Sequence, residues 1–221
     1  MRIAGALVLI AVRAAQCQST TVKDFPEFRV YAGVQGEHGE PLSGAKLCTT
    51  GTQRRCFSLA RWVGHYKDDE LTTDFGVRAR TQRIRVRDGG SLILFNANSF
   101  GGSGSSDRYA LLGMEENGRL RDLLPQVIVS NQADVVMWDL TTISPLPVLA
   151  TADALWEDGA HYGPHFFEVR IYRYDVVNDR YALKLKYRTV HRYPGIDNQV
   201  EGPDVLGKER GRIMEKLGTQ K

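Results

Sequence analysis

One segment of the chain concentrates side chains that are capable of chemistry. Residues 156–168 read WEDGAHYGPHFFE and carry two imidazoles and three carboxylates, those of Glu157, Asp158, His161, His165 and Glu168. Imidazoles and carboxylates together can bind a divalent metal or act as general acid and base. The HxxxH spacing brings both rings to one face only on a helix, and the Gly-Pro pair between them prevents a helix. We therefore expect a loop with structural or surface histidines, and metal binding is the alternative.

The aromatic residues of the same loop favour a binding surface over catalysis. Aromatic side chains beside polar groups are typical platforms for sugars and peptides. The candidate ligand-binding residues are Trp156, Glu157, Asp158, His161, Tyr162 and His165. The alternative is an exported metal-dependent hydrolase that uses the 157–165 loop, with His161, His165 and either Glu157 or Asp158 on the metal. The preferred interpretation assigns no catalytic residue and no cofactor.

A Gly/Ser-rich stretch, SFGGSGSSD at residues 99–107, invites two chemical interpretations that its residues exclude. A phosphate-binding loop ends in Gly-Lys-Ser/Thr before a helix, but this stretch has no lysine and leads into the strand-like RYALLGME. A nucleophilic serine needs Gly-x-Ser-x-Gly between a strand and a helix, and both the spacing and the helix are missing. We expect a connection between two strands.

The elements that must position these loops are predicted to be strands. Short runs rich in β-branched, aromatic and leucine residues are separated by Gly, Pro, Asn and Asp, which indicates a mostly β protein. The alternation of FEVRIY, residues 167–172, places its Phe, Val and Ile inward and Tyr172 outward. Such alternation is typical of an antiparallel sheet with one solvated face.

Two stretches, residues 91–125 and 146–189, share one order of strand, Gly-containing loop, strand, tight turn and strand, and residues 28–62 follow it more loosely. The Asn117–Gly118 pair predicts a hairpin with a type I′ turn. We expect an antiparallel meander or sandwich of two or three similar strand-loop-hairpin units. A short C-terminal helix follows, in which Leu206, Ile213 and Leu217 have helical spacing. The related loops, 99–107 and 157–165, would then share one edge as a composite rim.

The N-terminus predicts export. MRIAGALVLIAV has one arginine before an apolar run, and small residues follow, which is typical of a secretory signal peptide. The run is shorter than the about 20 apolar residues that span a bilayer. We expect cleavage near Cys17, with lipidation of Cys17 in an envelope protein as the alternative. Export favours a disulfide between the other two cysteines, Cys48 and Cys56, across a hairpin.

The chain is divided by these signals into five parts. They are a signal peptide (1–17), a flexible N-terminal segment (18–26), a first β unit with the disulfide (27–90), duplicated β meander units (91–200), and a C-terminal helix and tail (201–221).

Charge argues against a nucleic-acid partner, because the formal net charge is only +3 and both signs are mixed along the chain. In the one basic stretch, RARTQRIRVR, Arg83, Arg85 and Arg87 share one strand face, which we interpret as solvated. The sequence thus predicts a secreted or periplasmic, non-enzymatic binding protein without a transmembrane segment. The expected partner is a peptide, a glycan or an envelope protein, and the oligomeric state is left open.

Overall fold

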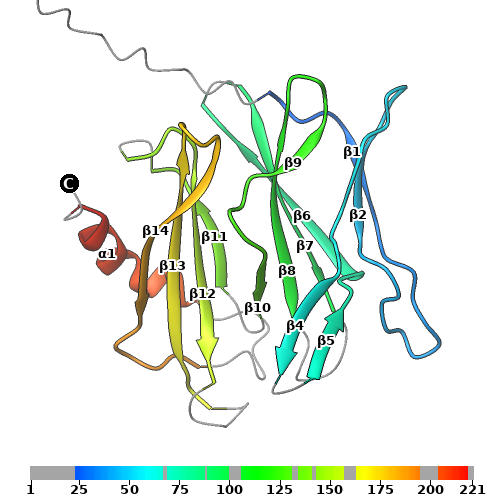
Figure 1. Ribbon diagram of the computed structural model, residues 1–221. Helices are drawn as coiled ribbons and strands as arrows, with labels where there is room; N and C mark the ends of the chain where they lie inside the picture. The colour runs from blue at the N-terminus through cyan, green and yellow to red at the C-terminus, as the bar shows by residue number, and fades with distance from the viewer. Residues whose placement is uncertain are drawn as a thin grey trace, which may run out of the picture.

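The structure is a computed structural model that describes residues 23–66, 69–87, 89–99, 106–130, 134–140, 143–156, 163–194 and 204–218. The described chain is mostly antiparallel β with one C-terminal helix, as predicted. Its main elements form four layers: a first sheet, a second sheet, a third sheet and helix α1 (Figure 1). No helix among these residues is long and apolar enough to cross a membrane.

Each sheet joins strands that are neighbours in the sequence. The first sheet contains β1 (Phe28–Tyr31), β2 (Lys46–Thr49) and β3 (Cys56–Ser58). The second contains β6 (Val77–Arg85), β7 (Ser91–Asn98), β8 (Asp107–Met114), β9 (Leu120–Asp122) and β10 (Ile128–Ser130). The third contains β11 (Asp134–Trp138), β12 (Val148–Leu155), β13 (Phe166–Asp175) and β14 (Arg180–Arg188). A separate hairpin pairs β4 (Trp62–Tyr66) with β5 (Asp69–Thr73).

The second and third sheets share a connectivity that matches the predicted meander. In both sheets the paired strands are antiparallel. In the second sheet, β9 and β10 pair with different parts of the same edge of β8. The order strand, loop, strand, turn, strand is therefore present in β7–β9 and again in β12–β14. Descent of these units from an internal duplication stays a prediction.

Three hydrophobic cores separate the four layers. Phe25, Leu47, Phe75, Phe95 and Leu112 belong to the core between the first and second sheets. Leu92, Leu111, Leu149, Tyr172 and Tyr181 belong to the core between the second and third sheets. Val148, Phe167, Ile171, Leu206 and Ile213 belong to the core between the third sheet and α1. The two middle sheets are consequently covered on both faces.

This layering corrects the expectation of one solvated face. Phe167, Val169 and Ile171 are buried under α1, as the alternation predicts. Tyr172, predicted to face outward, is also fully buried, because the second sheet covers the opposite face of β13. Period-two alternation identifies the two faces of a strand, but it does not reveal that a second layer covers the less apolar one.

Helix α1 (Val205–Gly218) is fixed to the third sheet by apolar and polar contacts. Its predicted apolar residues Leu206, Ile213 and Leu217 are buried. The carboxylate of Asp134, on β11, accepts a hydrogen bond of 2.7 Å from the Leu206 N–H at the start of the helix. This satisfies one of the amide groups that a first helical turn leaves unpaired.

Glu209, a charged residue on the buried face of α1, is held by the third sheet and its C-terminal extension. Its carboxylate accepts hydrogen bonds from the hydroxyls of Tyr187, at 2.9 Å, and Tyr193, at 2.5 Å. Arg212, one turn along the helix, lies 3.2 Å from the same carboxylate. Burial and the hydrogen bond to Glu209 raise the pKa of Tyr193 to about 12. The hydroxyls therefore stay protonated and keep donating at physiological pH.

The β8–β9 connection is a hairpin, as predicted, but its turn is not of type I′. Gly118 has a φ of 78°, whereas Asn117 is not among the residues with positive φ. The Gly118 N–H donates to the Glu115 carbonyl, and the Glu115 N–H donates to the Arg119 carbonyl. This pattern is a type I turn followed by a glycine bulge, in which only the glycine needs positive φ.

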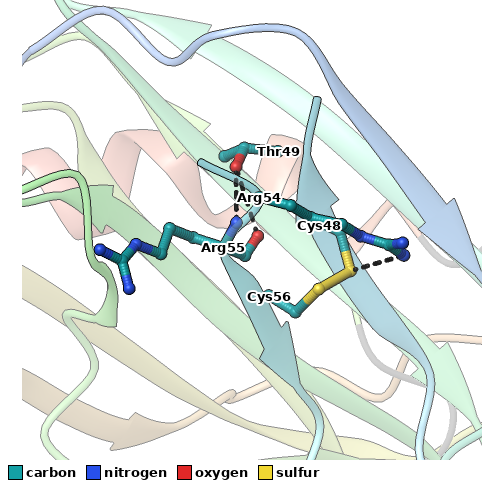
Figure 2. Close-up of a disulfide and its surroundings, with 5 residues drawn as sticks. All are labelled: Cys48, Thr49, Arg54, Arg55 and Cys56. Atoms are coloured by element: carbon teal, nitrogen blue, oxygen red, sulfur yellow. Dashed lines mark hydrogen bonds between the residues drawn. A yellow bond between two sulfur atoms is a disulfide. The ribbon is translucent and has the colours of Figure 1, made fainter. Parts of the chain in front are cut away.

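The predicted disulfide joins Cys48 and Cys56, which face each other across the β2–β3 pair (Figure 2). The turn that it closes is also held by its backbone: the Thr49 N–H donates to the Arg55 carbonyl at 2.8 Å. In return, the Arg55 N–H donates to the Thr49 hydroxyl at 2.9 Å. The position of Arg55 is therefore fixed by covalent and hydrogen bonds together.

The double substitution Cys48→Ser with Cys56→Ser should lower the free energy of unfolding by about 2.5 kcal/mol, measured by urea denaturation. The reason is that the bond spans a sequence separation of 8, and its loss restores the entropy of that loop in the unfolded chain. The wild type in reductant is the control and should match the variant. A variant as stable as the oxidised wild type would contradict the structural role of the bond.

Candidate functional site

Of the six predicted ligand-binding residues, the structure describes two. Glu157, Asp158, His161 and Tyr162 lie outside the described residues. Trp156 and His165 are in edge-to-face contact, with ring centroids 4.8 Å apart. The prediction for the loop as a whole therefore stays a prediction.

His165 is buried and lies in an isolated β-bridge with Tyr193. It is 2 % exposed, and its backbone exchanges two hydrogen bonds of 2.8 Å with Tyr193. Neither ring nitrogen has a hydrogen-bond partner among the residues that the structure describes. No group of three or more His, Cys, Asp or Glu side chains that could hold a metal occurs among the residues that the structure describes. The hydrolase alternative would need ligands from outside that set, namely His161 with Glu157 or Asp158.

His165→Leu should raise the free energy of unfolding by about 1 kcal/mol, because it removes two buried nitrogens that lack partners. The control, His191→Leu, changes an exposed side chain and should leave stability within about 0.5 kcal/mol of wild type. Thermal unfolding with and without zinc checks both. Zinc stabilisation of the wild type that His165→Leu abolishes would overturn this assignment in favour of a metal site.

The strands that lead into the two predicted rim loops end close together. Residues 100–105 and 157–162 are outside the described residues, but β8 begins at Asp107 and β12 carries Asp153 near its end. Ser130 of β10, the register partner of Asp107, donates its hydroxyl to the Asp153 carboxylate. Both loops therefore start at the same end of the packed second and third sheets (Figure 1).

The space between the two sheets is polar at this end. Asp107 and Asp153 both have a raised pKa, mainly because burial penalises their charged forms. Burial and the nearby Asp107 carboxylate also raise the pKa of the Tyr109 hydroxyl. Hydrogen bonds from Ser130 and the charge of Arg170 partly offset the burial of Asp153. These residues form a polar base at the ends of the strands that lead into the two loops.

Asp153→Asn should stabilise the protein more at pH 7 than at pH 4. A carboxyl whose pKa is raised by folding binds its proton more tightly in the folded state, so it costs stability as the pH rises above its unfolded pKa. Asp175→Asn is the control of opposite sign, because hydrogen bonding to Asn178 lowers the Asp175 pKa. That variant should be destabilised at pH 7 and less so at pH 4. Melting temperatures at both pH values check the pair, and equal pH dependence in the two variants would contradict it.

A groove of about 770 Å³ lies between the edge of the first sheet and the edge of the second. Its walls are β3 with the turn before it, and β9 with the turn before it. The lining residues are Arg54, Arg55, Cys56, Phe57, Ser58, Asn117, Arg119, Leu120, Arg121 and Asp122. Four of these ten are arginines and one is acidic, so the groove is strongly basic. We call it the arginine groove.

The single acid of the arginine groove does not neutralise it. The Asp122 carboxylate accepts hydrogen bonds of 3.1 Å from the backbone N–H groups of Leu111 and Leu124. Burial raises the pKa of Asp122, and these two hydrogen bonds oppose that shift. Its charge is thus directed toward the backbone and away from the arginines that share the groove.

The four arginines differ in what they already bind. Arg121 is paired with Asp179 at 2.6 Å and lies 3.6 Å from Glu115. Arg54 lies 3.6 Å from the Cys48 sulfur and stacks over the Tyr31 ring at 5.0 Å from its centroid. Figure 2 shows the Arg55 side chain extending away from the disulfide, on the side opposite Arg54.

Arg55 and Arg119 are the two guanidinium groups that the groove leaves open. Both residues are exposed, and neither forms an ion pair with another residue that the structure describes. One comes from the first sheet and the other from the hairpin of the second, on opposite walls. A guanidinium offers several donors in a planar fork that suits carboxylate, phosphate or sulfate.

Sequence reasoning missed this groove, and it interpreted the basic stretch that it did note, residues 78–87, as a solvated strand face. In that stretch Arg83 donates to the backbone carbonyls of Phe25, at 2.6 Å, and Pro26, at 3.0 Å, so it holds the N-terminal segment against β6. The only sequence signal for the groove is a pair of arginines beside each of two turns, QRRC and GRLR. Their proximity is created by the packing of two sheets.

Comparison with known protein families, with curated proteins and with solved structures gave no match.

Proposed function

We propose that the protein is an exported, non-enzymatic binding protein that takes an anionic partner in the arginine groove. The observation that carries this proposal is the pair of open guanidinium groups, Arg55 and Arg119, on opposite walls of one groove. Arginine is the residue of choice for carboxylate, phosphate and sulfate groups, because two parallel N–H donors can engage two oxygens.

The construction of the groove supports binding, because its walls are held in place before a ligand arrives. The disulfide and the two Thr49–Arg55 hydrogen bonds fix one wall. The other wall is the β8–β9 hairpin, in which the Asn117 side chain accepts a hydrogen bond of 2.7 Å from the Arg119 N–H. A preorganised site loses less conformational entropy on binding, which leaves more of the interaction energy as affinity.

Two features support export. Residues 1–17 have the sequence pattern of a signal peptide. The Cys48–Cys56 disulfide suits an oxidising compartment, where such bonds persist. Lipidation of Cys17 is the alternative, and it would anchor the protein, with the same groove, at a membrane surface.

The loop that follows β12 is a second candidate binding face. Trp156 is placed at its start, and the polar base of Asp107 and Asp153 lies at the ends of the strands that lead into both rim loops. A peptide, a glycan or an envelope protein remains the proposed class of partner there. The arginine groove is preferred because it combines two walls, a volume of about 770 Å³ and two open guanidinium donors.

The double variant Arg55→Ala with Arg119→Ala should bind anionic probes at least tenfold more weakly than wild type, because each guanidinium contact to an anion contributes about 1.5–3 kcal/mol. The probes are fluorescent oligoglutamate and a sulfated oligosaccharide, followed by fluorescence anisotropy at low salt. Affinity should also fall with added salt, since the open charges are exposed.

The matched control is Lys184→Ala with Lys208→Ala, which removes two positive charges from exposed positions outside the groove. It should keep most of the wild-type affinity. The proposal is contradicted if wild type binds neither probe, or if both double variants lose affinity equally.

A further inference from the structure

We infer that the partner of the arginine groove is an extended acidic peptide segment that pairs with β3 as an added strand of the first sheet. This inference rests on the proposed function, and it adds the chemical class of the ligand and the way in which it binds. Peptide recognition by strand addition uses backbone hydrogen bonds for affinity and alternate side chains for selectivity.

The first step is that β3 is an edge strand. The first sheet has the order β1-β2-β3, and within the described chain β3 pairs with β2 alone. An edge strand presents a row of unpaired N–H and C=O groups that another strand can use. The opposite wall of the groove is the edge strand β9, which pairs with β8 alone within the same described chain.

The second step is that the open backbone groups of β3 point into the groove. The Thr49 N–H bonds to the Arg55 carbonyl, and the Leu59 N–H bonds to the Ala45 carbonyl. Hydrogen-bonded and non-bonded pairs alternate along an antiparallel ladder. The residues between those pairs that face away from β2 are therefore Cys56 and Ser58, and both line the arginine groove.

The third step is the charge. Arg55 directly precedes the open Cys56 position, and Arg119 stands on the facing wall. A strand on β3 would direct alternate side chains to opposite faces, so acidic residues at alternate positions can reach these guanidiniums. A sulfated glycan could satisfy the guanidiniums as well, but it does not supply a strand-spaced row of amide donors and acceptors for β3. Unpaired backbone groups on β3 together with two guanidinium groups that have no ion-pair partner among the described residues favour a peptide.

Arginines at an edge also have a simpler role, because charged side chains discourage edge-to-edge aggregation. An edge guarded in this way would repel or ignore an added strand. An edge that recruits one should bind acidic peptides through their backbone. The experiment must therefore separate attraction of an anion from pairing of a strand.

The test measures binding of four fluorescent probes to the full mature chain. They are a peptide of alternating glutamate and valine, one version of it N-methylated at the glutamate nitrogens, one version N-methylated at the valine nitrogens, and a sulfated oligosaccharide. We expect the unmethylated peptide to bind, and one methylated version to bind at least tenfold more weakly. Amide hydrogen exchange at Cys56 and Ser58 should slow when the peptide is bound.

A proline variant gives a second, independent measurement. Ser58→Pro removes an N–H that points into the groove and leaves the β2–β3 hydrogen bonds intact, since proline is tolerated on edge strands. It should weaken peptide binding about tenfold without changing binding of the sulfated oligosaccharide. Ser58→Ala keeps the N–H and should bind both probes as wild type does. The melting temperature of each variant verifies that it is folded.

The outcomes distinguish the inference from the proposed function. Anion binding that depends on Arg55 and Arg119, but is insensitive to N-methylation and to Ser58→Pro, overturns strand addition and leaves the anion site standing. Absence of binding by every anionic probe overturns both. Arginine-dependent peptide binding that is lost on methylation and in Ser58→Pro, with slowed exchange at Cys56 and Ser58, supports strand addition.

Discussion

The structure depends on one constraint: the two middle sheets must each bury both of their faces. β7 and β12 are buried along nearly their whole lengths, with apolar or small side chains toward both neighbouring layers. Three stacked cores follow from this requirement, and each added layer covers a face that would otherwise expose apolar surface. At about 25 cal/mol per Å² of buried apolar surface, such burial is the dominant favourable contribution to folding. Because packing covers both faces of these sheets, only their edges and ends remain accessible to a binding partner.

The buried polar side chains differ in how many hydrogen-bond or ion-pair partners the packing gives them. Glu209 lies within a core, but its carboxylate accepts hydrogen bonds from two tyrosine hydroxyls and pairs with Arg212. These contacts offset the cost of burying the carboxylate and join the helix to the sheet. His165 is equally buried, but within the described part of the chain its ring nitrogens have no hydrogen-bond partner. Asp153 is intermediate, since Ser130 supports it while burial raises its pKa. Compensation therefore decides whether a buried polar residue stabilises the layer to which it belongs.

The arginine groove follows from the same layering. The first sheet is short, and its last strand, β3, ends beside the β8–β9 hairpin without pairing to it. Two edges that face one another at the border of two layers leave a channel with backbone groups on each side. The disulfide and the glycine bulge at Gly118 hold the two turns that carry Arg55 and Arg119. Both arginines are exposed on these turns, whereas Arg121 nearby is paired with Asp179.

The sequence by itself determined the local features of this protein. It predicted the antiparallel strands, the Cys48–Cys56 disulfide, the Asn117–Gly118 hairpin and the C-terminal helix, because each depends on residues close together in the chain. The turn type was wrong, since a glycine bulge and a type I′ turn both favour Asn-Gly. Tertiary structure alone decided that Tyr172 is covered, that Glu209 is buried with two tyrosines, and that Arg55 and Arg119 share a groove. The physical reason is that these facts depend on which layer packs on which, and contacts between residues distant in sequence leave no periodic trace in any one segment.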